Sequence, residues 1–272
     1  MRRGAVGQTV SATARGVTAA LRRMARPTGS FDATRYFRGD HGLEFYNVGT
    51  ERMRALARDV YAANKERWTV EDGMRLADVL IRDRHLETKS VGIEVVARFR
   101  KSFTPSLLPR WKGWLAQDLS ANWATTDALC GLLIGPLLVD RPALLARMSA
   151  WSRDRNMWVR RASAVALIPS VRHGVALDLA YGIAARLHPD GEDLIQKAVG
   201  WMLREAGKTD LDRLERYLLA NGARIPRTTL RYAIERCAEP RRREILAVTS
   251  RAARGRDRSA RRVSPAATRP RR

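Results

Sequence analysis

A weak repeat of about 36 residues constrains the fold of this chain more than any other feature. Apolar residues recur at three-and-four spacing with breaks at Gly, Pro, Asn or Asp, which predicts helices, and strand alternation is not evident. Aligning the second helix of each helix pair puts five residues at equivalent positions, 36, 35, 36 and 36 residues apart: Glu87, Trp123, Trp158, Leu194 and Leu230. A single pair cannot bury its own apolar face, so such pairs stack. We therefore predict an all-α solenoid of HEAT-like repeats with a curved, basic concave groove.

The helix and domain boundaries follow from the same pattern. An amphipathic first helix is expected over Thr9–Ala25. The later helices are expected over residues 51–64, 70–83, 87–102, 107–117, 122–138, 142–152, 157–169, 174–187, 192–207, 210–220, 227–237 and 240–249. Residues 1–249 are predicted to form a single repeat domain. Residues 250–272 are predicted to be a disordered tail, because residues 251–272 hold nine Arg, one acid and almost no large apolar residue.

The charge balance indicates a polyanionic partner. Lys and Arg total 51 against 28 Asp and Glu, which gives a formal net charge of +23. Six Arg in residues 1–31 and a net charge of +8 in the tail leave about +9 for the body, so the folded part is itself basic. Only six of the cations are lysines. The planar guanidinium fork of Arg suits phosphate, although an Arg excess also arises from GC-rich coding.

Composition and motifs exclude several other classes. Cys130 and Cys237 lack CxxC spacing, and the four His are scattered, so neither a disulfide framework nor a metal site is indicated. P-loop, dinucleotide-binding and nucleophile-elbow motifs are absent, so the chemistries that depend on them find little support. The longest apolar run, around Leu129–Val139, is interrupted by Gly and Pro and is too short to span a bilayer. We expect no membrane contact and a reduced, cytoplasmic location.

Three of the expected second helices carry aromatic and charged residues on one face. Trp123 and Asp127 are four residues apart, Trp158 and Arg161 three apart, and Lys197, Trp201 and Arg204 share a face. Cations hold phosphates, and tryptophan faces hold an electron-poor alkylated purine or its sugar. The lone carboxylate of Asp127 has a use there, because it stabilises positive charge developing on a deoxyribose as the glycosidic bond breaks, or activates water.

Structural explanations of the same residues stay open. A Trp on a helix is usually part of the core. In a purely structural role, Asp127 caps a helix or pairs with a neighbouring Arg. A solvated helix face without DNA contact is the structural explanation for four cations: Arg160, Arg161, Lys197 and Arg204.

The chain resembles the bacterial DNA alkylation-repair glycosylases of the AlkC/AlkD type, and the AlkD type most closely. Four segments carry the resemblance, which covers roughly residues 10–245: 122–127 (NWATTD), 151–162 (WSRDRNMWVRRA), 195–205 (IQKAVGWMLRE) and 227–235 (RTTLRYAIE), together with Tyr36-Phe37 and the region from Phe45 to Arg54.

The resemblance implies excision of 3-methyladenine and 7-methylguanine from duplex DNA without metal or organic cofactor, through contacts to backbone and sugar. It implies that Asp127 is the catalytic carboxylate, that Trp123 and Trp201 are the groove tryptophans and that Arg161 contacts phosphate and lesion. Tyr36 matches the aromatic of the N-terminal helices. Further DNA contacts are expected from the cations on the second helices and the terminal repeat: Arg160, Lys197, Arg204, Arg227 and Arg231.

Two departures from the family pattern stand out. The family commonly has a second acid directly after the first Trp, where this chain has Ala124. A family glycine near Phe45 is replaced by Asn47, a residue that tolerates a left-handed backbone better than other non-glycine residues do.

The sequence thus predicts a monomeric base-excision-repair glycosylase on the bacterial nucleoid, acting on alkylated duplex DNA without an obligate protein partner. The alternative is a noncatalytic repeat protein whose groove binds nucleic acid or an acidic partner, in which Asp127 has no chemical role. A third hypothesis is RNA binding through the arginine-rich ends.

Overall fold

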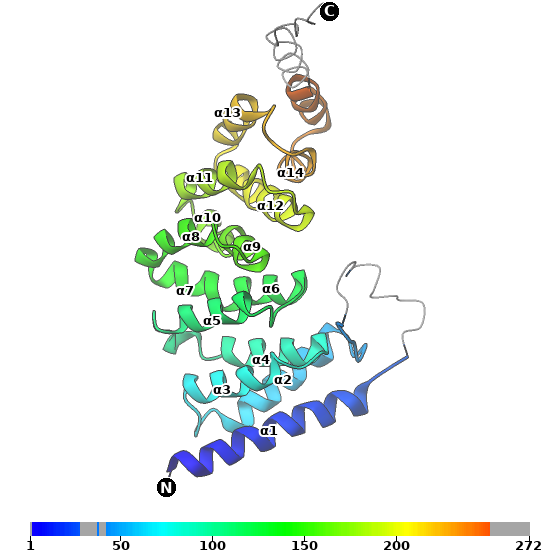
Figure 1. Ribbon diagram of the computed structural model, residues 1–272, viewed down its shortest axis with the longest axis vertical. Helices are drawn as coiled ribbons and strands as arrows, with labels where there is room; N and C mark the ends of the chain where they lie inside the picture. Colours follow the sequence, from blue (N-terminus) through cyan, green and yellow to red (C-terminus); the bar gives the residue numbers. More distant parts are fainter. Residues whose placement is uncertain (1, 28–36, 38–41, 251–272) are drawn as a thin grey trace, which may run out of the picture. The chain divides into compact units, whose positions relative to one another are not determined.

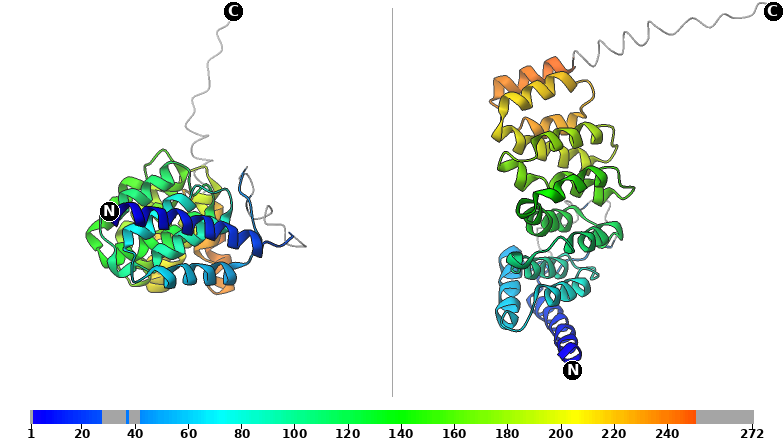
Figure 2. Two further views of the ribbon diagram at one scale, coloured as in Figure 1. Left: turned by 90° about the horizontal axis from the view of Figure 1, so that it is seen from below. Right: turned by 90° about the vertical axis from the view of Figure 1, so that its left-hand side faces the viewer.

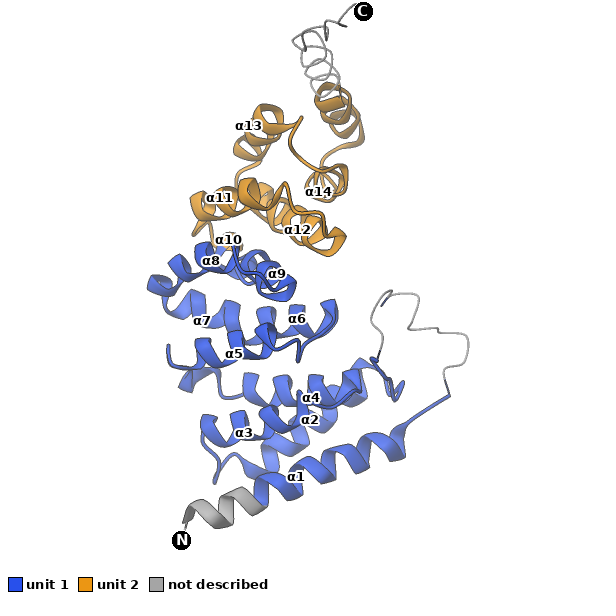
Figure 3. Ribbon diagram, viewed as in Figure 1, with its two compact units in different colours: residues 1–170 blue, residues 171–272 orange. Residues whose placement is uncertain are grey.

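The computed structural model describes residues 2–27, 37 and 42–250, and these residues are almost entirely helical (Figure 1). Within them the only extended pairing is an isolated parallel bridge between Glu44 and His85. The chain divides into two compact units, Met1–Ser170 and Val171–Arg272 (Figure 3). The prediction of one repeat domain over 1–249 stays a prediction. Of the predicted tail, Ser250 belongs to a described helical stretch, and residues 251–272 lie outside the described residues.

Unit 1 begins with a long helix, α1 (Arg2–Met24), which packs against α2, α3 and α4 (Figures 1 and 2). The face that α1 buries includes Val10, Ala14, Val17 and Leu21, at the three-and-four spacing expected of an amphipathic helix. The other helices of unit 1 are α2 (Thr50–Asn64), α3 (Val70–Leu80), α4 (Leu86–Ala97), α5 (Leu107–Ala116), α6 (Trp123–Leu129), α7 (Gly135–Asp140), α8 (Ala146–Trp151), α9 (Met157–Val165) and α10 (Ile168–Arg172), the last running into unit 2.

Unit 2 is also helical. Its helices are α11 (Leu177–Leu187), α12 (Asp193–Thr209), α13 (Leu211–Asn221) and α14 (Arg227–Ala233), followed by helical residues 239–250. The packing of α12 on α14 depends on Gly200, because a Cβ there would lie 2.4 Å from the Cβ of Tyr232. This close approach accounts for a glycine in the middle of a helix, where it otherwise weakens the helix.

The expected repeat spacing is matched by the starts of the second helices. Helices α4, α6, α9, α12 and α14 begin at residues 86, 123, 157, 193 and 227. The five aligned positions therefore all fall within the first turn of their helix. The first helix begins at Arg2, seven residues before the predicted start at Thr9. Other differences lie inside long segments: residues 122–138 are divided by a π-helical turn, and residues 87–102 end in the separate 3-10 turn Arg100–Ser102.

The tryptophans separate into two groups. Of the seven, four are buried in the core: Trp68, Trp111, Trp114 and Trp151. The other three, Trp123, Trp158 and Trp201, are only half-buried, and all three lie on second helices. Four tryptophans are thus part of the hydrophobic core. Burial in the core does not account for the other three, which are the ones that the sequence pattern placed at the candidate site.

The stretch Trp123–Asp140 is the one described helix long and apolar enough to cross a membrane by length and composition, with a mean hydropathy of 1.2. Half of it is buried inside the protein. A core helix of a folded domain has the same composition, and the buried side chains of this stretch, such as Leu129, Leu133 and Leu137, are in the core of unit 1.

Unit 2 contains two buried groups whose pKa values make it sensitive to acid. Burial lowers the pKa of His188 to about 4, and its Nε2 lies 2.7 Å from the Tyr217 hydroxyl. The pKa of Glu205 falls to about 2 because hydrogen bonds and charges from Arg172 and Lys208 outweigh the opposing effect of burial.

We expect the stability of unit 2 to fall as the pH is lowered from about 6.5 to about 4, because the unfolded chain then protonates His188 while the folded chain does not. A further loss follows below about pH 4.5, where unfolded but not folded Glu205 takes up a proton. Each group contributes on the order of 1–3 kcal/mol. Urea unfolding at pH 7, 5.5 and 4 measures this. His188→Gln keeps a partner for Tyr217 without titrating, so it should flatten the change between pH 6.5 and 4; an unchanged slope would exclude His188 as its cause.

Candidate DNA-lesion site

Asp127 and Arg161 form the ion pair at the centre of the candidate site. Nε of Arg161 donates to Oδ1 of Asp127 at 2.9 Å, and Nη2 donates to Oδ2 at 2.8 Å. The Arg161 side chain is only 5% exposed, whereas the Asp127 side chain is 17% exposed. The pair therefore presents its carboxylate, and not its guanidinium, toward solvent. Each carboxylate oxygen keeps further lone-pair capacity for another donor.

Two asparagine N-caps fix the starts of the two helices that carry Asp127 and Arg161. Asn122 caps α6 by accepting from the Thr125 amide at 2.8 Å, and Asn156 caps α9 by accepting from the Trp158 amide at 2.8 Å. Asp127 and Arg161 each lie five residues after their cap, so they occupy equivalent places in consecutive repeats. The two turns are also joined directly, since Nδ2 of Asn156 donates to Asp118 at 2.8 Å. The repeat itself thus brings the carboxylate and the guanidinium together.

The backbone around Asp127 is irregular on both sides. Asp118 and Ala121, in the turn before α6, have positive φ values of 56° and 45°. After α6, Cys130–Ile134 form a π-helical turn in which the Gly135 amide bonds to the Cys130 carbonyl. Pro136 follows and has no amide hydrogen, so it supplies no bond to the preceding turn. Single π turns inside helices are frequent at functional sites.

The environment of Asp127 acts on its ionisation in two opposing ways. Burial raises the pKa of the Asp127 carboxyl, and the charge and hydrogen bonds of Arg161 partly offset that rise. Burial and the nearby carboxylate also raise the pKa of the Cys130 thiol well above its usual value, so this neighbour stays neutral. A cation arriving beside a carboxylate stabilises it most when the carboxylate is largely removed from water and its charge is only partly neutralised.

An aromatic cluster lies at the start of α6, beside the ion pair. Phe37 stacks on Trp123 with ring centroids 5.2 Å apart and an interplanar angle of 10°. Phe37 also contacts Phe45, at 5.3 Å. The sequence drew attention to Tyr36, which lies outside the described residues; the described aromatic against Trp123 is its neighbour Phe37, which sequence reasoning did not select as a site residue.

Glu87 holds the loop that carries Phe45. Its two carboxylate oxygens accept from the amides of Tyr46 at 3.1 Å and Val48 at 3.4 Å. Asn47, between those residues, has φ 57°, and its Nδ2 donates to the Arg26 carbonyl at 3.3 Å. Asn47 thus takes the left-handed conformation that Asn tolerates better than other non-glycine residues do. The buried contacts of Glu87 to two backbone amides thus fix this loop against the start of α4.

The remaining predicted site residues lie on α9, α12 and α14. Arg160, on α9, donates to the carbonyls of Asp154 at 3.0 Å and Arg155 at 2.8 Å. In unit 2, Lys197 pairs with Asp193 at 2.7 Å and Arg204 pairs with Glu235.

The other unit 2 residues belong to the same two helices. Trp201 is half-buried on α12. Arg227, at the start of α14, donates to Thr249 at 3.1 Å, while Arg231 is exposed on the same helix. Their roles in DNA binding stay predictions, as does the contribution of Trp201 to the same site as Trp123.

The pairing of Asp127 with an Arg, left open by the sequence, is observed. Arg161 was expected to contact phosphate and lesion, and that contact stays a prediction. The structure places its guanidinium against Asp127, where it holds the carboxylate in position. Among the described residues, no three His, Cys, Asp or Glu side chains come together as metal ligands would.

Comparison with known proteins shows the family and the fold of this chain. Residues 17–237 match the family model described as "DNA alkylation repair enzyme". The chain is also similar to a solved structure from Enterococcus faecalis titled "Predicted DNA alkylation repair enzyme", with a TM-score of 0.69 and 18% identity over 79% of this chain and 97% of that one. None of the curated proteins matches. Since the family model spans most of the chain and includes every described residue of the candidate site, this protein belongs to the DNA alkylation repair enzyme family.

Proposed function

We propose that this protein is a DNA glycosylase that hydrolyses the N-glycosidic bond of cationic alkylated purines, 3-methyladenine and 7-methylguanine, in duplex DNA. Family membership supports a role in DNA repair. The observation that carries the reaction type is the half-buried, outward-facing carboxylate of Asp127, held by Arg161 and flanked by the half-buried Trp123.

The proposed reaction uses the charge that the lesion already has. As the bond from C1′ to the purine nitrogen breaks, both electrons pass to the base and cancel its positive charge, while positive charge develops on the sugar. The Asp127 carboxylate stabilises that sugar cation. A water oxygen then bonds to C1′, and the proton it loses passes to the carboxylate or to solvent. A cationic purine needs no acid to protonate it, so a site with one carboxylate suffices.

The tryptophans and Arg161 have supporting roles in this proposal. Trp123 and Trp201 hold the lesion nucleotide through ring faces that favour a cation. Arg161 fixes the carboxylate by two parallel hydrogen bonds, a geometry that gives orientation as well as charge. The basic surface residues supply sequence-independent affinity for the phosphate backbone.

The alternative of a noncatalytic DNA-binding repeat protein is supported by the same ion pair, since a buried Asp–Arg pair also serves a purely structural role. Release of free base from dimethylsulfate-treated duplex DNA, with protein in excess and EDTA present, separates the two. We expect release of 3-methyladenine and 7-methylguanine. DNA binding without release of either base would favour the noncatalytic protein.

A further inference from the structure

Lys89 is a buried basic residue that the reaction described above does not use. It lies on α4 and is only 6% exposed. Lysine is almost never buried to this extent unless its amino group has partners, because removing the charged group from water is costly. A lysine kept inside the protein at that cost indicates a specific task for its Nζ.

The Nζ of Lys89 joins the ends of two neighbouring repeats. It donates to the Ile81 carbonyl at 2.7 Å and to the Leu119 carbonyl at 2.7 Å. Ile81 is the C-cap of α3, and Leu119 lies in the turn between α5 and α6. The carbonyl end of a helix carries a partial negative charge, which suits a basic side chain. Lys89 thus ties the turn before α6 to the end of α3.

The turn that Lys89 holds contains an unfavourable backbone conformation. Asp118 and Ala121 have φ values of 56° and 45°. Asp tolerates this left-handed region, whereas the Cβ of Ala comes too close to the following carbonyl oxygen. Such conformations persist only where the surrounding contacts fix them. Ala121 directly precedes Asn122, the N-cap of α6, so its backbone sets the direction in which α6 begins.

Hydrogen bonds fix this turn from both neighbouring repeats. On one side the donor is Lys89 of α4, and on the other Nδ2 of Asn156, the N-cap of α9, donates to Asp118 at 2.8 Å. Within the turn, Oγ1 of Thr126 donates to Oγ of the fully buried Ser120 at 3.0 Å. Thr126 is the residue before the candidate carboxylate. The turn and the part of α6 that carries the carboxylate are therefore bonded to each other.

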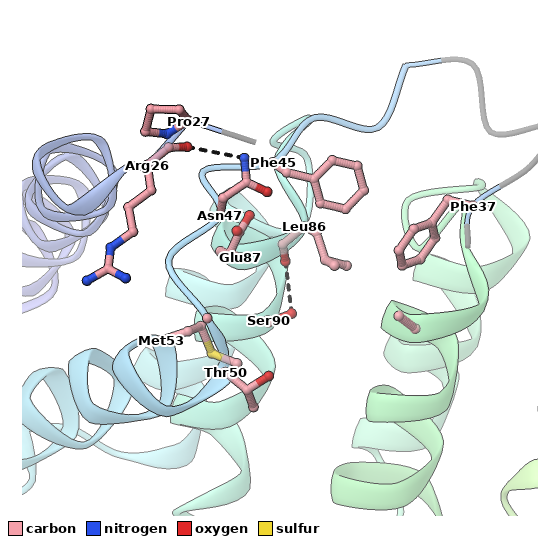
Figure 4. A pocket seen from close by; sticks show the side chains of 12 residues that line it. Arg26, Pro27, Phe37, Phe45, Asn47, Thr50, Met53, Leu86, Glu87 and Ser90 are labelled. Carbon is pink, nitrogen blue, oxygen red and sulfur yellow. Dashed lines mark hydrogen bonds between the residues drawn. The ribbon is translucent and has the colours of Figure 1, made fainter. Parts of the chain in front are cut away.

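The start of α4 also holds the aromatic side of the candidate site. Glu87, two residues before Lys89, accepts hydrogen bonds from the loop that carries Phe45, and Figure 4 shows the two residues close together. Phe45 contacts Phe37, which stacks on Trp123. Two buried polar side chains of α4 thus act on the two segments that meet at the start of α6.

We propose that Lys89 is a positioning residue for base release, whose Nζ keeps residues 118–121 in their left-handed turn and so holds Trp123 and Asp127 where the lesion reacts. Lys89 itself is buried and does not touch DNA. The effect on catalysis rests on the proposed glycosylase function. A misplacement of about 1 Å, caused by a change far from the reacting atoms, lowers a rate by up to about a hundredfold.

The first test is Lys89→Met, which keeps nearly the same length and removes the donor. We expect the single-turnover rate of 7-methylguanine release, with protein in excess, to fall about ten- to a hundredfold. Affinity for duplex DNA should stay unchanged. Ile93→Ala is the matched control, because it destabilises the same helix by leaving a cavity and takes no hydrogen bond from the turn. Thermal unfolding verifies that both variants fold. A wild-type rate in Lys89→Met, or an equal loss in Ile93→Ala, would overturn the proposal.

Variants at Ala121 test the turn while Lys89 stays in place. Ala121→Val should lower the rate as Lys89→Met does, because a branched side chain is a poor fit to a positive φ. Gly adopts this conformation without a steric cost, so Ala121→Gly should keep the rate. Added to Lys89→Met, it should recover several-fold of the lost rate. A double variant without recovery would contradict the role of Lys89 in holding the turn.

A measurement without chemistry separates this proposal from the proposed function. Nε–H of Arg161 donates to Asp127, so its NMR signal reports whether the carboxylate is in place. We expect this signal to shift and to exchange faster with water in Lys89→Met but not in Ile93→Ala. If the wild type releases no base, the glycosylase proposal fails while the signal still tests the positioning. A signal that Lys89→Met leaves unchanged would overturn the positioning role.

Discussion

Replacing Asp127 by Asn should lower the single-turnover rate of 7-methylguanine release by about 10²–10³-fold, the range observed when one preorganised electrostatic contact to a transition state is lost. Asn has nearly the same shape and its carbonyl oxygen still accepts one hydrogen bond from Arg161, but it has no negative charge for the sugar cation. Affinity for undamaged duplex DNA should be kept or increased, since a carboxylate is removed from a surface that approaches phosphates. Rapid-quench assays with protein in excess, together with DNA-binding titrations, measure both quantities.

The pH dependence of the wild type provides a second measure of the same carboxylate. Burial raises the pKa of Asp127, so the rate should fall at a higher pH on acidification than it would for an exposed aspartate. The residual activity of Asp127→Asn should lack this acid limb. An Asn variant with wild-type rates, or with an unchanged acid limb, would assign the chemistry to another residue.

Replacing Arg161 by Met should be the most destabilising substitution at the site. Arg161 is almost fully buried, and its removal leaves the Asp127 carboxylate in place without its partner. Breaking a buried ion pair in this way costs about 3–5 kcal/mol. Urea unfolding at neutral pH measures the loss, and it should shrink at acid pH, where protonated Asp127 no longer needs a counter-charge.

A double variant separates the pair from simple packing. If the lost ion pair causes the instability of Arg161→Met, adding Asp127→Leu should make the protein more stable than Arg161→Met alone, because no unpaired carboxylate then remains. Base release should be lost in both. A double variant that is as unstable as the sum of the two single variants would show that Arg161 contributes through packing and not through its charge. Arg160→Met, on the neighbouring position of α9, is the matched control for the loss of one arginine.

Much of the fold was predictable from spacing, because each repeat forms one pair of amphipathic helices and the pairs start at near-constant intervals. The starts of α4, α6, α9, α12 and α14 follow this rule. Caps contributed as well: Asn122 and Asn156 each precede a helix and carry the side-chain oxygen that an N-cap requires. What spacing does not give is the hydrogen-bond pattern inside a helix, so the π turn at Cys130–Ile134 was missed, although Pro136 signals a break.

The candidate site was predictable in part. Helical spacing puts Trp123 and Asp127 on one face, but a contact between α6 and α9 depends on the angle and offset of two helices that sequence spacing does not fix. The bidentate pair of Asp127 with Arg161 was therefore only one of several alternatives. Phe37 reaches Trp123 across a long stretch of chain, and no local pattern encodes that contact. The equal distance of Asp127 and Arg161 from their caps is the signal that could have suggested their pairing.

The most direct test of the central claim is the rate of base release from two duplexes that differ in one charge. One contains a single 7-methylguanine, which is cationic, and the other contains 7-deaza-7-methylguanine, its neutral isostere. With protein in excess and EDTA present, we predict that the wild type releases 7-methylguanine well above the spontaneous rate and leaves the isostere intact. Binding of both duplexes without release of 7-methylguanine would contradict the account and support a noncatalytic DNA-binding protein.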